Sequence, residues 1–254
     1  MARILMLLPD RDFDPTEAAV PWFVLRTAGH EVFFANASGG AARCDQMTLK
    51  GLRPDGKPMR GLLKTLAARP ENVRLYQNME RDENYQYAQR WKDVQPQHYE
   101  ALVLPGGHAP GMRPYLESDE VRRICRHCFE TQAPIASVCH GVLALARTKR
   151  EDGKSILHGY RVTGLNKFQE NTAYKMTRKL FGDHYRTYAC TVQDEVTAVL
   201  ARPEDFKSGP RFPSFGSSRR PHKGFVVRDR HLISARWPGD VWKLATEFRQ
   251  MVDE

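Results

Sequence analysis

The chain has 254 residues and a formal charge of +9, and 41% of its residues are hydrophobic and 27% charged. This length suits one large α/β domain or two small ones, and the composition is that of a folded protein rather than a disordered one. No apolar stretch approaches the ~20 residues of a membrane span, and the apolar run at residues 4–8 is too short for the core of a signal peptide. We therefore expect a cytoplasmic protein that does not bind membranes.

The five cysteines are an odd number without the spacing of a disulfide framework, which indicates a reducing compartment. Cys125-Arg126-His127-Cys128 has the spacing of a metal-binding or redox pair. It falls within a helical pattern, and no second pair completes a zinc site. We therefore expect two cysteines on a helix face, and we assign no metal ligands and no cofactor.

Basic residues are concentrated in a segment rich in Gly, Ser and Pro, at residues 202–223. Such a segment can attract nucleic acid or an anionic surface. Aromatic residues do not alternate with the basic ones here, so we predict a solvated loop and no nucleic-acid partner.

The expected elements alternate between strand and helix in the first half of the chain, which predicts a parallel sheet covered on both faces. Taken in order, they are a strand at 4–8, a helix at 14–28, a strand at 31–35, a strand at 101–104, a helix at 118–131, a strand at 134–138 and a helix at 142–146. Further on we expect strands at 161–163 and 196–200 around a helix at 169–180, a hairpin of 225–227 and 231–234, and a last helix after residue 239. The predicted fold is α/β, a doubly wound, mostly parallel sheet sandwiched by helices, as in flavodoxin.

One segment interrupts this alternation, at residues 41–96, which are polar and broken by Pro and Gly, with a helix-like patch at 80–91. It is longer than an ordinary α/β connection. We interpret it as an insertion within a single domain that covers one end of the sheet.

The most informative segment is Pro134-Ile135-Ala136-Ser137-Val138-Cys139-His140-Gly141. A short apolar strand, a cysteine at a sharp turn and a helix have the layout of a nucleophile elbow. The start of the helix would favour the thiolate of Cys139. The alternative is a buried structural cysteine, which is common.

Other residues are expected at the same edge of the sheet, where ligands bind in doubly wound folds. Glu17 stands three residues after Asp14, in the pattern of a helix cap, so its local spacing favours a capping role over proton transfer. The backbone N–H groups of Gly106 and Gly107 are candidates for an oxyanion site. His140 would act as acid or base if an acid oriented it, and Glu170 and Asp194 are acids downstream of the elbow.

Several motifs occur together in one order. They are Asp12-x-x-Pro15-Thr16-Glu17, residues 28–32, residues 99–108, residues 136–141 and Thr163-Gly164. In this combination the chain resembles the ThiJ/PfpI superfamily, whose fold is similar to that of class I glutamine amidotransferases. In having an insertion at 41–96, the chain resembles the larger branch of this superfamily, which contains heat-shock chaperones with glyoxalase III activity.

The resemblance implies a role for each matching residue. Cys139 matches the nucleophile, Glu17 the acid that hydrogen-bonds it and shuttles protons, His140 the histidine after the nucleophile, and Gly107 the oxyanion-site glycine. Glu170 falls where an acid completes a Cys-His-acid triad in this branch. The resemblance also implies a homodimer.

The leading interpretation is a cofactor-independent lyase that converts methylglyoxal to lactate through a hemithioacetal on Cys139, with Glu17 as proton shuttle. A cysteine peptidase or amidase of the same fold is one alternative. A glutaminase of the related fold needs a His-x-Glu pair downstream of its nucleophile, whereas the pair in this chain, His98 and Glu100, lies upstream. A stress-response chaperone or oxidation sensor is the other alternative, because a thiolate at an elbow is easily oxidised.

Overall fold

A central seven-stranded sheet organises the chain in a computed structural model, which describes residues 1–211 and 214–254. In spatial order its strands are β5 (Gln89–Arg90), β3 (Glu31–Asn36), β1 (Arg3–Leu7), β6 (Ala101–Leu104), β7 (Ile135–Val138), β9 (Leu232–Ala235) and β8 (Val226–Asp229). Only the β8–β9 pair is antiparallel. The mostly parallel α/β prediction is confirmed.

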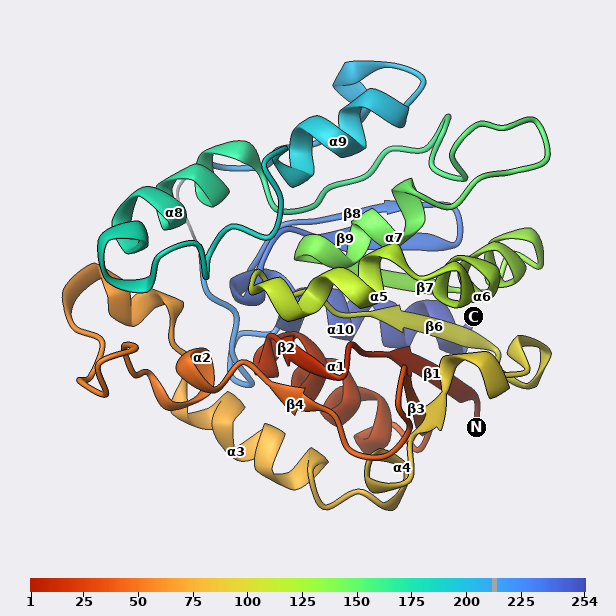
Figure 1. Cartoon of the computed structure of the whole chain (residues 1–254). Helices are drawn as coiled ribbons and strands as arrows, with labels where there is room; N and C mark the ends of the chain where they lie inside the picture. Colours follow the sequence, from red (N-terminus) through yellow and green to blue (C-terminus); the bar gives the residue numbers. More distant parts are fainter. Residues whose placement is uncertain (212–213) are drawn as a thin grey trace.

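Helices cover both faces of the sheet (Figure 1). One layer contains α1 (Pro15–Thr27) and α10 (Val241–Asp253), and α3 (Pro70–Met79) packs on α1. The other layer contains α5 (Arg113–Glu117), α6 (Asp119–Glu130) and α7 (Val142–Ala146). The central strands β6 and β7 are buried along their whole length, which explains why they read as continuous apolar runs.

Segment 41–96 contributes to several parts of the fold. It contains β4 (Arg43–Cys44), α2 (Gln46–Lys50), α3, α4 (Glu83–Gln86) and the edge strand β5. β4 pairs with β2 (Arg11–Phe13) in a separate two-stranded sheet. The helix expected over 80–91 is only the single turn α4, because the chain then extends to pair β5 with β3.

Two expected strands are wrong. Residues 196–200 belong largely to α9 (Val192–Val199), where Thr191 caps the helix by accepting from the Asp194 N–H, and Val192 and Val196 bury one face. The β-branched residues of this segment thus fill the apolar face of a helix. Residues 161–163 make a single parallel bridge, between Val162 and Phe206, rather than a strand. The expected helix near 169–180 is α8 (Lys167–Phe181), and the expected hairpin is β8–β9.

The expected cysteine pair lies on α6 with both side chains buried. Cys125 and Cys128 are free thiols within the hydrophobic core, as expected for two helix-face cysteines. Of the basic segment, residues 212–213 lie outside the described residues. None of the helices in the described part of the chain is long and apolar enough to span a bilayer.

Candidate active site

Three neighbouring strands bring the candidate residues to one edge of the sheet. β1, β6 and β7 are adjacent and parallel, so their carboxyl ends meet there. The chain continues from β1 to Glu17, from β6 to Gly106 and from β7 to Cys139. The topology therefore gathers these residues although they are far apart in the sequence.

Cys139 sits at a strained turn between β7 and α7. Its φ of +57° lies in the left-handed region, which is unusual for a residue other than glycine and is typical of a nucleophile elbow. The turn packs against the neighbouring strand β6, since a Cβ on Gly141 would clash with the carbonyl oxygen of Leu104, the last residue of that strand. The expected strand, sharp turn and helix are thus present around Cys139, and the cysteine side chain is buried beneath the surface.

Glu17 does not cap its own helix. Asp14 is the cap of α1 and accepts hydrogen bonds from the N–H groups of Thr16 and Glu17. A capping box would require the Glu17 carboxyl to accept from the Asp14 N–H. That N–H instead donates to the Gly106 carbonyl at 2.9 Å, and Glu17 Oε2 accepts from the Gly106 N–H at 2.8 Å. The capping interpretation of Glu17 is wrong.

The Glu17 carboxyl faces the Cys139 thiol. Because Oε2 accepts from Gly106, a proton on this carboxyl resides on Oε1, which has no hydrogen bond of standard geometry within the described residues. The Cys139 thiol lies within hydrogen-bonding reach of the carboxyl. A carboxylic acid held in this way can pass a proton to or from the sulfur or a molecule bound to it.

Burial favours the protonated forms of both groups. It raises the pKa of Glu17 well above its ordinary value, and the charge of Asp14 adds to this. It also raises the pKa of the Cys139 thiol, and the charges of Glu17 and Asp14 act in the same direction. The expected stabilisation of the thiolate by the helix start is therefore outweighed, and the thiol proton must leave during reaction with substrate.

His140 lies directly beside the sulfur. Its Nδ1 is 3.5 Å from Cys139 Sγ, and its backbone N–H also hydrogen-bonds the sulfur. Burial, with the charges of His108 and Arg147, lowers the pKa of His140 to about 3, so its imidazole is neutral. A neutral imidazole of such low basicity is suited to hydrogen bonding rather than to holding a proton.

The two glycines after β6 differ in what they can offer a substrate. The Gly106 N–H is occupied by Glu17, so it is not available to stabilise an oxyanion. The Gly107 N–H has no acceptor within the described residues. A Cβ on Gly106 would lie 2.8 Å from both Cys139 Cβ and Glu17 Oε2, so this position admits only glycine.

Glu170 lies in the first turn of α8 and lines the same pocket as Cys139. Its Oε2 accepts from the Val192 N–H at 2.9 Å, and its Oε1 has no partner in the described parts of the chain. Burial raises the pKa of Glu170 to about 7. The hydrogen bonds that the described residues make do not join Glu170 to His140, so its place in a triad stays a prediction. Asp194 instead bonds Lys167 and Thr191 at an exposed site.

A pocket of about 270 Å³ opens above Cys139. Its walls are mostly apolar and come from segment 41–96, from α8 and from the loop before α10; they include Leu62, Leu66, Leu165, Phe168, Met176, Phe215 and Trp237. Asp14 also lines the pocket, and burial raises its pKa to about 7. The sequence indicated Asp14 only as a helix cap.

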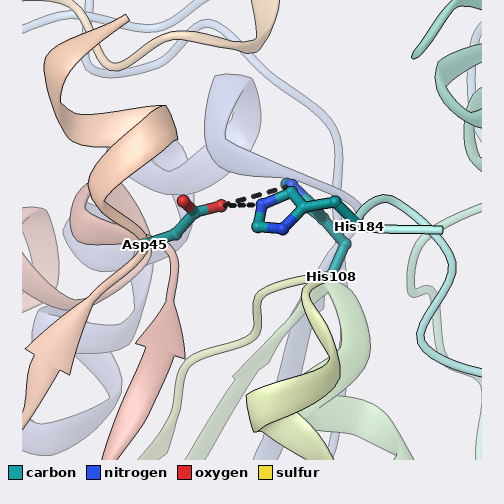
Figure 2. Close-up of side chains that lie close together, drawn as sticks. All are labelled: Asp45, His108 and His184. Carbon is teal, nitrogen blue, oxygen red and sulfur yellow. Dashed lines mark hydrogen bonds and ion pairs between the residues drawn. The ribbon is translucent and has the colours of Figure 1, made fainter. Parts of the chain in front are cut away.

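Three further side chains meet near this pocket that the sequence reasoning did not connect. Asp45, His108 and His184 converge from separate segments (Figure 2), and His108 also lines the pocket. His108 ends the motif at residues 99–108, whereas no expected motif or element pointed to Asp45 or His184 in the sequence.

Comparison with known proteins agrees with this geometry. A family model described as ThiJ/PfpI family-like matches residues 8–210. A deglycase from Pyrococcus abyssi is 29% identical over 55% of this chain and 61% of its own length. A glutamine amidotransferase-like class 1 domain-containing protein from Xenopus laevis is 26% identical over 60% of this chain and 56% of its own length. The matches thus span less than two thirds of these relatives.

Solved structures show the same fold over nearly the whole chain. Glyoxalase III from Candida albicans superimposes with a TM-score of 0.69 at 17% identity, covering 98% of this chain and 97% of that one. Drosophila melanogaster DJ-1beta superimposes with a TM-score of 0.54 at 17% identity, covering 99% and 92%. With the family match and the elbow geometry together, the chain belongs to the ThiJ/PfpI family, with the class I glutamine amidotransferase-like fold.

Proposed function

We propose that this protein is a cofactor-independent enzyme that acts on small reactive carbonyl compounds and converts methylglyoxal to lactate. One observation carries the proposal: the Glu17 carboxyl is held by the Gly106 N–H and lies within hydrogen-bonding reach of the Cys139 thiol, which lines a pocket. The names of its relatives, a deglycase and a glyoxalase III, support chemistry on such carbonyls.

The first step is addition of Cys139 sulfur to the aldehyde carbon. The S–C bond forms, Glu17 gives the proton on Oε1 to the aldehyde oxygen, and the thiol proton replaces it on the carboxyl. This exchange suits a site in which thiol and carboxyl both start protonated. The Gly107 N–H, which has no acceptor within the described residues, is the donor that can stabilise the developing oxyanion.

The hemithioacetal then becomes a thioester by internal proton transfer. Glu17 moves the hydrogen of the former aldehyde carbon to the ketone carbon through an enediol, so one carbon is oxidised and its neighbour reduced without a cofactor. Water cleaves the thioester, releasing lactate and restoring the thiol. The covalent intermediate divides one difficult step into easier ones.

The pocket is wider than methylglyoxal requires, and its walls favour an apolar substituent. A substrate panel should therefore include phenylglyoxal beside methylglyoxal and glyoxal. We expect the efficiency kcat/KM to rise with the apolar group, because the aromatic ring can pack against Leu66, Phe168 and Met176.

The test is lactate formation from methylglyoxal by the wild type, Cys139→Ser and Glu17→Gln, with Cys190→Ser as the matched control at an exposed cysteine. The proposal predicts turnover by the wild type and Cys190→Ser, and loss of at least about 100-fold in the other two. No turnover by the wild type on the whole panel, or full activity of Cys139→Ser, would overturn it. Activity on peptide or amide substrates that depends on Cys139 would favour a hydrolase instead.

Two observations weigh against other functions. Glu100 accepts a hydrogen bond from the Arg3 N–H at the amino end of β6, the end of the sheet opposite Cys139, so the His98–Glu100 pair cannot serve a glutaminase site. The burial and raised pKa of Cys139 are unfavourable for an oxidation sensor, which needs an accessible thiolate. A homodimer is proposed from the family resemblance and is tested by the mass in solution.

A further inference from the structure

A second cluster of side chains lies beside the pocket and has no part in the proposed reaction. Asp45 lies between β4 and α2, His108 follows the Gly106-Gly107 turn, and His184 follows α8. Figure 2 shows both imidazoles directed at the same carboxylate. Asp45 Oδ2 is 2.9 Å from His184 Nε2 and 3.8 Å from His108 Nε2.

The carboxylate in this cluster is fixed by its surroundings. Asp45 caps α2, and its Oδ1 accepts from the N–H groups of Met47 and Thr48 at 2.9 and 3.2 Å. Its Oδ2 accepts from the Thr48 hydroxyl at 3.0 Å and is the oxygen that faces the two histidines. Hydrogen bonds of this kind orient a metal-binding carboxylate.

One of the imidazoles is held in place and lacks a hydrogen bond. The His108 ring stacks on the Tyr185 ring, with centroids 4.1 Å apart and planes inclined by 19°. Its Nε2 is buried and has no hydrogen-bond partner among residues 1–211 and 214–254. A buried polar atom without a partner costs free energy, and a metal bond at this nitrogen would remove that cost.

We propose that Asp45, His108 and His184 bind a divalent first-row transition-metal ion through Asp45 Oδ2 and the two Nε2 atoms. Two histidines and one carboxylate are a common ligand set for Zn²⁺ and Fe²⁺. The ligand atoms all lie within 4.8 Å of one another. Bonds of about 2.0–2.1 Å in a tetrahedral site place ligand atoms ~3.4 Å apart. The two measured separations bracket that value, so small side-chain movements complete the site.

Three protein ligands leave a coordination position for water or another small ligand. His108 belongs both to the cluster and to the pocket lining, so the bound ion would fix one wall of the Cys139 pocket. The ion also joins three segments that are distant in sequence. It should therefore stabilise the folded protein by binding it in preference to the unfolded chain.

The test is equilibrium dialysis of the full chain against Zn²⁺ after removal of metals by a chelator, with the metal content measured. We expect one Zn²⁺ per chain for the wild type and a loss of affinity above about tenfold for Asp45→Asn and for His184→Gln. Asn retains the helix cap, so Asp45→Asn should remain folded. The controls are His98→Gln at an exposed histidine and Cys139→Ser, both of which should bind like the wild type.

Two further measurements distinguish metal binding at this cluster from binding at cysteines or elsewhere on the protein. Zn²⁺ should raise the melting temperature of the wild type but not that of His184→Gln. Co²⁺ should give d–d absorption without a thiolate charge-transfer band. A thiolate band, substoichiometric binding by the wild type, or affinity unchanged in both ligand variants would overturn the proposal. Asp45 and His184 would then be a hydrogen-bonded pair that joins two loops.

Discussion

Glu17 Oε2 accepts a hydrogen bond of 2.8 Å from the Gly106 N–H, although 89 residues separate the two in sequence. This bond holds the Glu17 carboxyl beside the Cys139 thiol. Because the two groups are buried side by side, the ionisation of one changes the pKa of the other. A substitution of Glu17 should therefore change the pKa of the Cys139 thiol.

The first prediction concerns the reactivity of the thiol. In the wild type, alkylation of Cys139 by iodoacetamide should still accelerate above pH 9, because burial and nearby carboxylates raise the pKa of the thiol. Glu17→Gln removes the charge that Glu17 carries once it is ionised at alkaline pH, so the rise should move to lower pH. A wild-type rate already at its plateau at pH 7 would contradict this.

The second prediction concerns the close packing at Gly106. In Gly106→Ala the new Cβ would lie 2.7 Å from the Val138 carbonyl oxygen and would press on Cys139 and Glu17. We expect a loss of about 1–3 kcal/mol in the free energy of unfolding and a large loss of activity. Gly29→Ala is the control: its Cβ meets nothing within 4 Å, and its φ of +88° should cost about 1 kcal/mol without affecting activity. Equal activity losses in both variants would refute the argument.

The third prediction is a pH dependence of stability. The pKa of Glu170 is about 7 in the folded protein, above that of an exposed glutamate, so the folded state binds this proton more tightly than the unfolded state. The contribution of protonated Glu170 to the free energy of unfolding is fully present below about pH 4 and is lost as the pH rises to about 7.

Glu170→Gln removes this dependence while its amide oxygen can still accept from the Val192 N–H. Relative to the wild type, it should raise the free energy of unfolding at pH 8 by on the order of 2 kcal/mol and change it little at pH 4. Urea denaturation of the variant and the wild type at pH 8 and at pH 4 measures these two differences in the free energy of unfolding. A variant destabilised equally at both would show that Glu170 is ionised and paired in the folded state.

The fourth prediction concerns the ion pair beneath the pocket wall. Arg236 and Asp240 are fully buried, with contacts of 2.7 and 3.0 Å between them. Removing one partner leaves a buried charge, so Arg236→Met should cost about 3–5 kcal/mol, and the double variant with Asp240→Leu should recover part of it. The exposed Arg249–Asp253 pair is the control, and Arg249→Met should cost less than about 1 kcal/mol. No recovery in the double variant would count against charge burial as the cause.

The sequence indicated the sheet and the elbow because both depend on local patterns. Buried parallel strands give continuous apolar runs, and Cys139 stands between such a run and a helix. The pairing of Glu17 with Gly106 depends on which strands are neighbours, so local spacing favoured a capping role that Glu17 does not have. The family resemblance placed Glu17 beside Cys139, where the structure has it.

Other features depend on contacts that spacing does not encode. Asp45, His108 and His184 come from three segments with no common motif, so the cluster exists only after folding. The start of the helix was expected to favour the thiolate of Cys139. Burial has the opposite effect and raises the pKa of the thiol, and local spacing does not reveal burial. Secondary structure is ambiguous in the same way at residues 196–200. A run of β-branched residues fits either a strand or one face of a helix, so its type could not be decided from the sequence.

The most direct test of the account is rapid-quench mass spectrometry of the protein mixed with methylglyoxal. The proposed mechanism predicts that one methylglyoxal adds to the peptide containing Cys139 in the wild type and proceeds to lactate. In Glu17→Gln it predicts that any adduct formed on Cys139 persists without conversion to lactate. Lactate formed with no adduct on Cys139, or an equal yield of lactate from Cys139→Ser, would contradict it.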